Sequence, residues 1–504
     1  MFQRVFGAGL NGIEAQLVSV EADVSGGLPQ FNMVGLLSSE VREAKERVTR
    51  AFSNSGIELP ARKITINLSP ANMRKRGSGF DLPIAVAILA ALGMIRTEGL
   101  AEIMFVGELS LDGNINSCDG ILPMALMARK EKMKTMIVPA ENAFEGAYVE
   151  GLRICPICTL EELIMRLNAD DLPDVEHLSL DDELEKAYRK NRLDYADIRG
   201  QQKAVRATRV AVAGFHNLLY IGPPGSGKSM MAQRIPTILG RLSRDECLEI
   251  SKIYSVMGML KDQSLVLERP FRAPHHSITG PALIGGMGTP RPGEITLAHK
   301  GVLFLDEAAE YKKDILQQLR QPLEDKQVLI SRMAGNTVFP ADFMLVLASN
   351  PCPCGNYPEP SCHCSQVQVH RYLSKLQGPL LDRIDICAGT SKLQVGELNG
   401  QTGANSAQMR QSILMAQQIQ KERFEGLPVQ FNSQMSRSEV DRFCQLKPKD
   451  RMVLEQAYQR YNMSARGYYK ILKVARTIAD LEGSADIERD HLLEAIGYRN
   501  TYIE

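Results

Sequence analysis

The octapeptide Gly222–Ser229 constrains the fold of this chain more than any other segment. It reads Gly-Pro-Pro-Gly-Ser-Gly-Lys-Ser, the pattern of a phosphate-binding loop, in which two glycines bracket four residues before lysine and serine. The apolar run Asn217–Ile221 before it predicts a strand, and the residues from Met230 onward are compatible with a helix. A plain turn between two core elements is the alternative. The strand–loop–helix order predicts an α/β core that binds a nucleotide.

Each part of this loop has a predicted contact with the nucleotide. Backbone N–H groups of the glycine-rich turn and of the helix N-terminus point at phosphate oxygens. Lys228 is predicted to bind the β- and γ-phosphates, and the Ser229 hydroxyl to bind Mg²⁺. The predicted nucleotide-binding residues are Gly222, Pro223, Pro224, Gly225, Ser226, Gly227, Lys228, Ser229 and Met230.

A second motif, Gly301–Glu307, completes the first. Val302–Leu305 is a continuous apolar run, as expected of a strand buried on both faces of a parallel sheet. Two carboxylates follow it, at the end of the strand where open α/β sheets bind ligands. Asp306 is predicted to hold Mg²⁺ and Glu307 to polarise the water that attacks the γ-phosphate. Together the two motifs predict an NTPase.

A third buried strand is predicted over Phe343–Asn350, and it ends in an amide. Asn350 is predicted to orient the attacking water from the side opposite Glu307. The alternative is an asparagine that only caps the end of the strand.

Two arginines are candidates for contact with the γ-phosphate. Arg383 follows Asp382 and precedes Asp385 by two residues. Arg383 is predicted to stabilise transition-state charge on the γ-phosphate, as arginine fingers do, often from a neighbouring subunit. The alternative is a local ion pair with either acid. Arg466 lies near the start of a C-terminal helix opened by Ser464, where it could reach the nucleotide from a helical lid.

A cysteine-rich loop over residues 351–365 carries other chemistry. Its prolines oppose a helix, and four thiolates so close together favour tetrahedral Zn²⁺, although the C-x-C spacing is less common than C-x₂-C. His363 is an alternative ligand, and a metal-free, redox-sensitive loop is an alternative interpretation. Cys155 and Cys158 are predicted to belong to the core. The predicted zinc ligands are Cys352, Cys354, Cys362 and Cys364.

The chain divides into three blocks and two joints. Its 504 residues are enough for two to four domains. A segment over Asn399–Asn405 is predicted to be a flexible joint. The predicted parts are a strand-and-helix domain over 1–168, an acidic linker over 169–195, an NTPase core over 196–395 and a helical domain over 396–504.

Composition limits the partners and the compartment. The formal net charge is zero, so polyanion binding must come from local patches. The largely apolar run over 82–95 has 14 residues, which is too short to span a bilayer and predicts a buried helix. Ten cysteines without an apolar signal segment indicate reduced thiols or metal ligands. We therefore expect a cytoplasmic protein with no membrane partner.

Several motifs together resemble the magnesium-chelatase-like AAA+ ATPases, and more narrowly the bacterial ComM/YifB family, over nearly the whole chain. They are Phe271–Ser277, Gly285–Gly286, Pro292–Ile295, His299–Glu307 and Asn350–Gly355. The resemblance implies a hexameric AAA+ ring whose subunits have an α/β core and a helical lid.

The same resemblance assigns roles to single residues. Asn350 would be sensor 1, Arg383 the arginine finger and Arg466 the sensor 2 arginine. The family is regarded as containing a DNA helicase that promotes branch migration during integration of transforming DNA.

The N-terminal block resembles the Lon protease domain through Phe105–Ile115 and Lys134–Asn142. A protease of this type needs a serine nucleophile activated by a lysine. In the resemblance, Gly79 stands at the serine position and Leu122 at the lysine position; Ser78 is one residue away, and Lys75 is not where the family keeps its base. The resemblance therefore implies an α+β domain that has lost peptidase activity and serves assembly or DNA contact.

The segment Glu324–Pro340 is predicted to form two short strands about a Gly-Asn turn. In related AAA+ rings such a hairpin before sensor 1 points into the central pore. Lys326 and Arg332 are therefore candidates for DNA contact, and so is Arg272 on the neighbouring loop. An ion pair or a nucleotide contact of Arg332 is the alternative.

Three functions compete at this point. The first is an ATP-driven hexameric DNA motor with Mg²⁺ and Zn²⁺, the second an ATP-dependent protease or unfoldase, and the third a metal-chelatase-type ATPase subunit. Missing dyad residues argue against the second. The fused Lon-like domain and the cysteine loop argue against the third.

Overall fold

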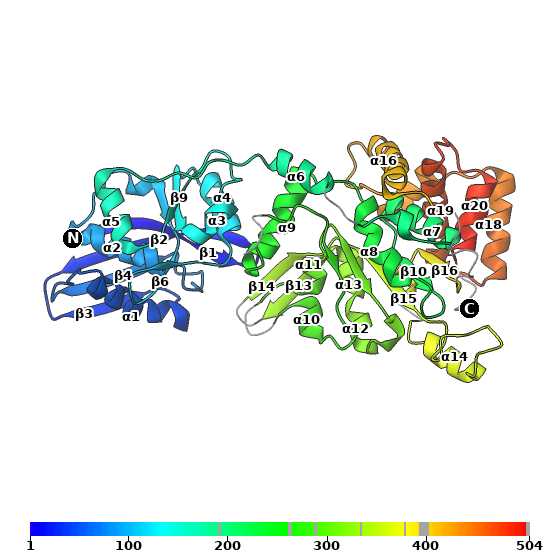
Figure 1. Cartoon of the computed structure of the whole chain (residues 1–504), viewed down its shortest axis with the longest axis horizontal. Helices are drawn as coiled ribbons and strands as arrows, with labels where there is room; N and C mark the ends of the chain where they lie inside the picture. The colour runs from blue at the N-terminus through cyan, green and yellow to red at the C-terminus, as the bar shows by residue number, and fades with distance from the viewer. Residues whose placement is uncertain are drawn as a thin grey trace. The chain divides into compact units, whose positions relative to one another are not determined.

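A computed structural model describes residues 1–189, 193–260, 265–286, 290–332, 335–376, 380–392 and 403–499. The chain forms two compact units, traced in Figure 1. The first comprises Met1–Glu185 and Ser243–Leu267, and the second comprises Lys186–Leu242 and Glu268–Glu504. Within the described ranges, no helix is both long enough and apolar enough to cross a membrane.

The first unit is built on a mixed seven-stranded sheet in the order β3-β4-β2-β1-β5-β8-β9. Strands β1, β2 and β4 pair antiparallel, and the remaining neighbours pair parallel. Buried and partly exposed residues alternate along β2 and β4, as expected of strands with one face in the core. The strands are β1 (Phe2–Asn11), β2 (Glu14–Ser25), β3 (Gln30–Val34), β4 (Lys63–Ser69), β5 (Ile103–Phe105), β8 (Thr135–Pro139) and β9 (Arg153–Ile157), with a small hairpin of β6 (Glu108–Leu109) and β7 (Ile115–Asn116).

The helices of this unit include α2, which is buried from Asp81 to Ala91. The prediction that the apolar run is a buried helix is confirmed for this span. The segment 169–195, expected to be a linker, contains helix α6, whose Leu180 and Leu184 are buried. The helices are α1 (Ser39–Asn54), α2 (Asp81–Leu92), α3 (Ile121–Lys130), α4 (Ala143–Gly146), α5 (Leu160–Ala169) and α6 (Leu180–Arg189), whose residues after Glu185 belong to the second unit.

A helix from the middle of the chain, α9 (Arg244–Val256), also belongs to the first unit. The Ser255 carbonyl accepts the Gly120 N–H at 3.0 Å, and the Ser255 hydroxyl donates to Glu145 at 2.6 Å. Lys252 pairs with Glu14 at 2.6 Å. The chain therefore leaves the second unit after its first helices and returns to it at residue 268.

The second unit contains a five-stranded, all-parallel sheet in the order β11-β12-β15-β10-β16. The predicted parallel sheet is confirmed. Strands β10, β12 and β15 are buried along their whole length, because helices cover both faces of such a sheet. The strands are β10 (Leu218–Ile221), β11 (Phe271–Arg272), β12 (Val302–Leu305), β15 (Met344–Ser349) and β16 (Ile386–Gly389).

A hairpin of β13 (Gln327–Arg332) and β14 (Gly335–Pro340) precedes β15, as predicted. The predicted Gly-Asn turn is wrong, because Gly335 and Asn336 lie in β14 and pair with Arg332 and Ser331. The burial of Val328, Ile330 and Phe339 fixes this register, since a shift by one residue would expose them. Residues 333–334, between the two strands, lie outside the described ranges.

The described residues 403–499 of the C-terminal part form helices joined by loops and no strand, as predicted. Helices α16 and α19 pack on α7, so the lid shares one hydrophobic core with the sheet. Most of the predicted joint over Asn399–Asn405 lies outside the described residues. The helices of the second unit are α7 (Gln202–Gly214), α8 (Lys228–Ile238), α10 (Gly280–Ile284), α11 (Glu294–Leu297), α12 (Lys313–Gln318), α13 (Arg320–Asp325), α14 (Gln366–Leu373), α16 (Ser406–Arg423), α17 (Arg437–Phe443), α18 (Pro448–Arg460), α19 (Ala465–Leu481) and α20 (Arg489–Gly497).

Candidate nucleotide-binding site

The loop between β10 and α8 has the backbone that the motif requires. Gly225 and Gly227 have φ values of 74° and 85°, in the left-handed region that favours glycine. A Cβ atom at Gly222 would collide with Thr390, which follows β16. These three glycines allow a tight loop at the N-terminus of α8, where backbone N–H groups can bind phosphate.

Lys228 is the first residue of α8, and its side chain is largely buried. Its Nζ donates to the carbonyls of Gly222 at 2.7 Å and Pro223 at 2.8 Å, and to Asn350 Oδ1 at 3.2 Å. Burial lowers the pKa of Lys228, and the nearby charges of Asp306 and Glu307 oppose that shift. The predicted lysine and the predicted sensor asparagine therefore meet, because β10 and β15 are neighbours in the sheet.

The two predicted Mg²⁺ ligands also meet. The Ser229 hydroxyl donates to Asp306 Oδ2 at 2.5 Å. A hydroxyl and a carboxylate on adjacent elements, beside a loop that binds phosphate, are oxygen ligands that suit Mg²⁺. The residues present therefore fit a magnesium nucleotide.

Glu307 follows Asp306 in a left-handed conformation, with φ of 50°, and its side chain is 58% exposed. Its Oε2 lies 3.7 Å from His276 Nδ1, on the loop after β11. The ring of Tyr311 meets His276 edge-on at 6.4 Å. Sequence reasoning identified the His275–His276 loop as part of a family motif but missed its position beside the predicted catalytic carboxylate.

The four predicted zinc ligands lie together. The Cys352–Cys354, Cys354–Cys362 and Cys352–Cys362 sulfur distances are 3.4, 3.6 and 3.8 Å, and all four sulfurs lie within 4.8 Å of one another. Tetrahedral Zn–S bonds of about 2.3 Å place sulfurs about 3.8 Å apart. Hydrogen bonds from the backbone N–H groups of Asn356 and His363 lower the pKa of Cys354 to about 6.

The donor set therefore fits Zn²⁺, with Cys364 as the fourth ligand. Among the described residues, His363 does not join the cluster. Cys155 is buried in β9 as predicted, whereas Cys158 is exposed, because β9 ends one residue before it. The prediction that Cys158 belongs to the core is wrong.

The cysteine loop lies against the phosphate-binding loop. A Cβ atom at Gly355 would lie 2.5 Å from Pro224 Cδ, and Gly355 has φ of 79°. The loop continues directly from β15 and Asn350. The cysteine loop therefore packs directly on Pro224 of the predicted phosphate-binding loop.

We expect purified protein to contain about one zinc per chain, because four thiolates fill a tetrahedral site. Replacing Cys352 and Cys354 with Ser should release the metal and lower ATP affinity through Pro224. Metal analysis of protein purified in reductant measures the first effect. The matched control is Cys444→Ser, since Cys444 is a buried cysteine outside the cluster. Protein without zinc would contradict the expectation.

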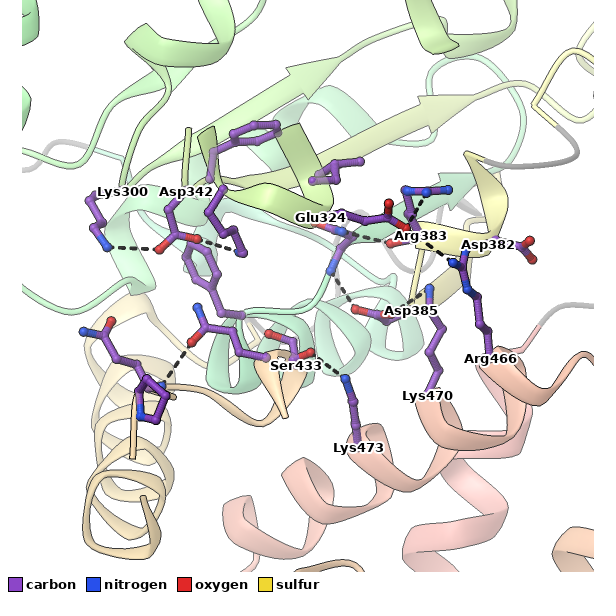
Figure 2. Close-up of a pocket in the computed structure, with 18 of the residues that line it drawn as sticks. Lys300, Glu324, Asp342, Asp382, Arg383, Asp385, Ser433, Arg466, Lys470 and Lys473 are labelled. Carbon is purple, nitrogen blue, oxygen red and sulfur yellow. Dashed lines mark hydrogen bonds and ion pairs between the residues drawn. The ribbon is translucent and has the colours of Figure 1, made fainter. Parts of the chain in front are cut away.

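Arg383 and Arg466 lie at the other edge of the sheet, around a pocket of about 710 Å³ (Figure 2). The pocket is lined by Asn217, Phe343 and Asp385, and each of them is the residue immediately before a strand. The phosphate-binding loop leaves the carboxyl end of β10, and a four-residue strand spans about 13 Å. The pocket that the two arginines line therefore lies at the amino ends of the strands, opposite the phosphate-binding loop.

The ion pair of Arg383 differs from both predicted alternatives. Its Nη2 pairs with Glu324 Oε1 at 2.5 Å rather than with a neighbouring acid. Asp385 instead pairs with Lys470 at 2.9 Å. Burial alone would raise the pKa of Asp385, but Lys470 and His216 hold it far below its usual range.

Two of the three candidate DNA contacts bind acids of the same unit. Lys326 pairs with Asp342 at 2.6 Å, and Arg272 binds Glu294 through two hydrogen bonds of 2.7 Å. Burial raises the pKa of Asp342, but Lys326 and a second lysine outweigh it and lower the pKa to about 2. The Arg332 side chain lies outside the described residues.

In the Lon-like part of the first unit, the described residues nearest the serine position make other contacts than a serine–lysine dyad would. The Ser78 hydroxyl donates to Glu108, and Lys75 Nζ donates to the Pro70 carbonyl. Leu122 is buried in α3. These contacts place an acid, not a lysine, on the nearest serine.

Family models match three stretches of the chain: magnesium chelatase subunit ChlI over residues 194–398, subunit ChlI of Mg-chelatase over 20–142, and the ChlI C-terminal region over 403–499. The competence protein ComM of Haemophilus influenzae is 42% identical over 495 residues, which cover 97% of this chain and 95% of that protein. The chain belongs to the ComM/YifB family. This is a family of magnesium-chelatase-like AAA+ ATPases with a Lon-protease-like N-terminal domain.

Two other relatives support the two parts of this description. The YifB protein of Escherichia coli is 40% identical over 490 residues, 97% of this chain and 95% of that protein. Lon protease 2 of Bacillus subtilis is 27% identical over 169 residues, 32% of this chain and 30% of that protein. The ComM/YifB family thus combines an AAA+ core that binds ATP and Mg²⁺ with a domain similar to Lon.

Proposed function

We propose that the chain is an ATP-driven motor that remodels DNA as a hexameric ring. ATP hydrolysis is carried by Lys228, Ser229, Asp306, Glu307 and Asn350. The observation that supports it most is the convergence of these side chains at the carboxyl ends of β10, β12 and β15, with Ser229 on Asp306 and Lys228 on Asn350. Glu307 is exposed where an attacking water must enter.

The proposed hexameric ring is supported by the position of two arginines. Arg383 and Arg466 lie at the sheet edge opposite the phosphate-binding loop, so each can reach a nucleotide bound by a neighbouring subunit. A head-to-tail interface of this kind repeats around a closed ring. Arg383 then acts as the arginine finger and Arg466 as the sensor 2 arginine.

DNA is proposed as the substrate because the chain is similar over 97% of its length to a protein named for competence. The reaction is proposed to be branch migration during integration of transforming DNA, in the cytoplasm. The hairpin β13–β14 and Lys326 at its base are the proposed contacts, with Arg332 and Arg272. Zinc in the cysteine loop is proposed to keep Pro224 and Asn350 in place.

The test is ATPase activity with and without single-stranded, duplex and branched DNA. We expect branched or single-stranded DNA to stimulate hydrolysis severalfold. Stimulation by an unfolded protein instead of DNA would favour an unfoldase. Activity that appears only with a chelatase partner protein would favour a chelatase subunit.

Replacing Lys326 and Arg332 with Ala should weaken DNA binding and flatten its salt dependence by about one unit of slope for each lost phosphate contact. Binding measured at several salt concentrations checks this. Asp342→Asn is the matched control, because it breaks the Lys326–Asp342 pair but keeps the cation. Unchanged affinity and slope in the double variant would move the DNA contact elsewhere.

A further inference from the structure

Two arginines from different elements meet on one carboxylate (Figure 2). Glu324 Oε1 lies 2.5 Å from Arg383 Nη2 and 3.5 Å from Arg466 Nη2. Three of the four lysines that line the pocket have other acids, since Asp342 binds Lys300 and Lys326 and Asp385 binds Lys470. The fourth, Lys473, donates to the Ser433 carbonyl at 2.9 Å. One carboxylate oxygen thus faces two guanidinium groups.

The three side chains differ in exposure. The Arg383 side chain is 8% exposed, whereas those of Glu324 and Arg466 are 49% and 61% exposed. The buried arginine is therefore fixed, and the carboxylate is the partner that can be replaced. A terminal phosphate offers more negative charge and three acceptor oxygens to two guanidinium forks, so it competes well against a single carboxylate oxygen.

Resting on the proposed function, in which Arg383 acts on the nucleotide of a neighbouring subunit, we propose that Glu324 is a latch for both arginines. It binds Arg383 and Arg466 until the γ-phosphate of the neighbour's ATP displaces it. Glu324 touches no reacting atom, and it acts as a positioning residue through the arginines.

The latch lies on the element that leads into the hairpin. Glu324 is in the last turn of α13, two residues before Lys326. The Lys326 ammonium pairs with Asp342 at 2.6 Å, and its carbonyl accepts the Ala341 N–H at 2.8 Å, so both contacts close the base of β13–β14. Displacement of Glu324 therefore links ATP on one subunit to the hairpin of the next.

Glu324→Gln tests the latch, because the amide keeps the shape and removes the competing charge. We expect the half-saturating ATP concentration of the full-length protein to fall about three- to fivefold, the effect of losing one half-exposed ion pair. The maximal rate at saturating ATP should stay within about twofold, since the finger itself is intact. A merely structural role would not lower the ATP requirement.

Three further variants make the result decisive. Asp325→Asn makes the same change on the next, exposed residue of α13 and should have no effect. Glu324→Asp keeps the charge and should restore the normal ATP requirement. In protein that carries both Arg383→Ala and Arg466→Ala, adding Glu324→Gln should leave nucleotide affinity unchanged in a direct binding measurement, because the latch acts only through these two arginines.

The outcomes separate the latch from the finger. If Glu324→Gln raises the ATP requirement or lowers the maximal rate while Arg383→Ala remains inactive, the latch is overturned and the finger stands. If assembled Arg383→Ala protein hydrolyses ATP at the wild-type rate, the finger falls and the latch with it. Thermal unfolding of each variant, with Glu324→Ala as a second substitution, checks that the chain is folded.

Discussion

Glu307→Gln protein should bind ATP normally and lose at least about 100-fold of its turnover. The amide keeps the size of the side chain but cannot take up a proton from the attacking water. Because the Glu307 side chain is 58% exposed, we expect no loss of folding stability. Steady-state ATPase activity and nucleotide binding, measured on the same preparation, separate the two effects.

The matched control for this variant is Glu310→Gln, three residues further on. Glu310 lies 3.9 Å from Lys375 and is 44% exposed, so it undergoes the same chemical change at a side chain that is not a predicted nucleotide contact. Its turnover should remain at the wild-type level. Normal hydrolysis by Glu307→Gln would mean that another group activates the water.

A mixture of Arg383→Ala protein with Lys228→Ala protein should hydrolyse ATP when neither variant does so alone. Loss of an arginine finger costs about 1,000-fold or more in turnover. In mixed rings, some interfaces pair an intact phosphate loop from one variant with an intact arginine from the other. At equal amounts these make up about a quarter of the interfaces of a head-to-tail ring.

The control is a set of mixed rings confirmed by capture through a tag on one variant. Arg383→Lys is a second substitution, because it retains a charge opposite Glu324 and lowers the risk of unfolding. Confirmed mixed rings without recovered activity would mean that Arg383 acts within its own subunit or only supports the fold.

The nucleotide site was largely predictable because its residues follow buried strands. The motif at Lys228 and the carboxylates at Asp306–Glu307 each end an apolar run, and parallel strands bring such ends to one edge. The order of the strands in the sheet was harder to predict from the sequence, although this order brings Asn350 to Lys228. Local patterns do not encode which strands become neighbours.

Partners of single charged groups were not predictable in the same way. Arg383 has acids one and two residues away in the sequence, yet its short 3₁₀ helix directs the side chain to Glu324, 59 residues earlier. His276 beside Glu307 depends likewise on the pairing of β11 with β12. The Gly-Asn pair predicted the wrong turn position, because burial along the hairpin, not turn preference, fixes the register of the two strands.

Helix α9 has a consequence for how such a protein can be divided. The chain passes between its two units three times, at residues 185–186, 242–243 and 267–268. A protease cut in the segment 169–195 removes only one of these connections, and the two halves of the cut chain still share the first unit. A truncated ATPase beginning at residue 196 would keep α9 without its partners and expose Ile250 and Ile253 to water. Recombination that exchanged only one of the two units would separate α9 from its partners and would therefore be selected against. We expect the two units to be inherited together.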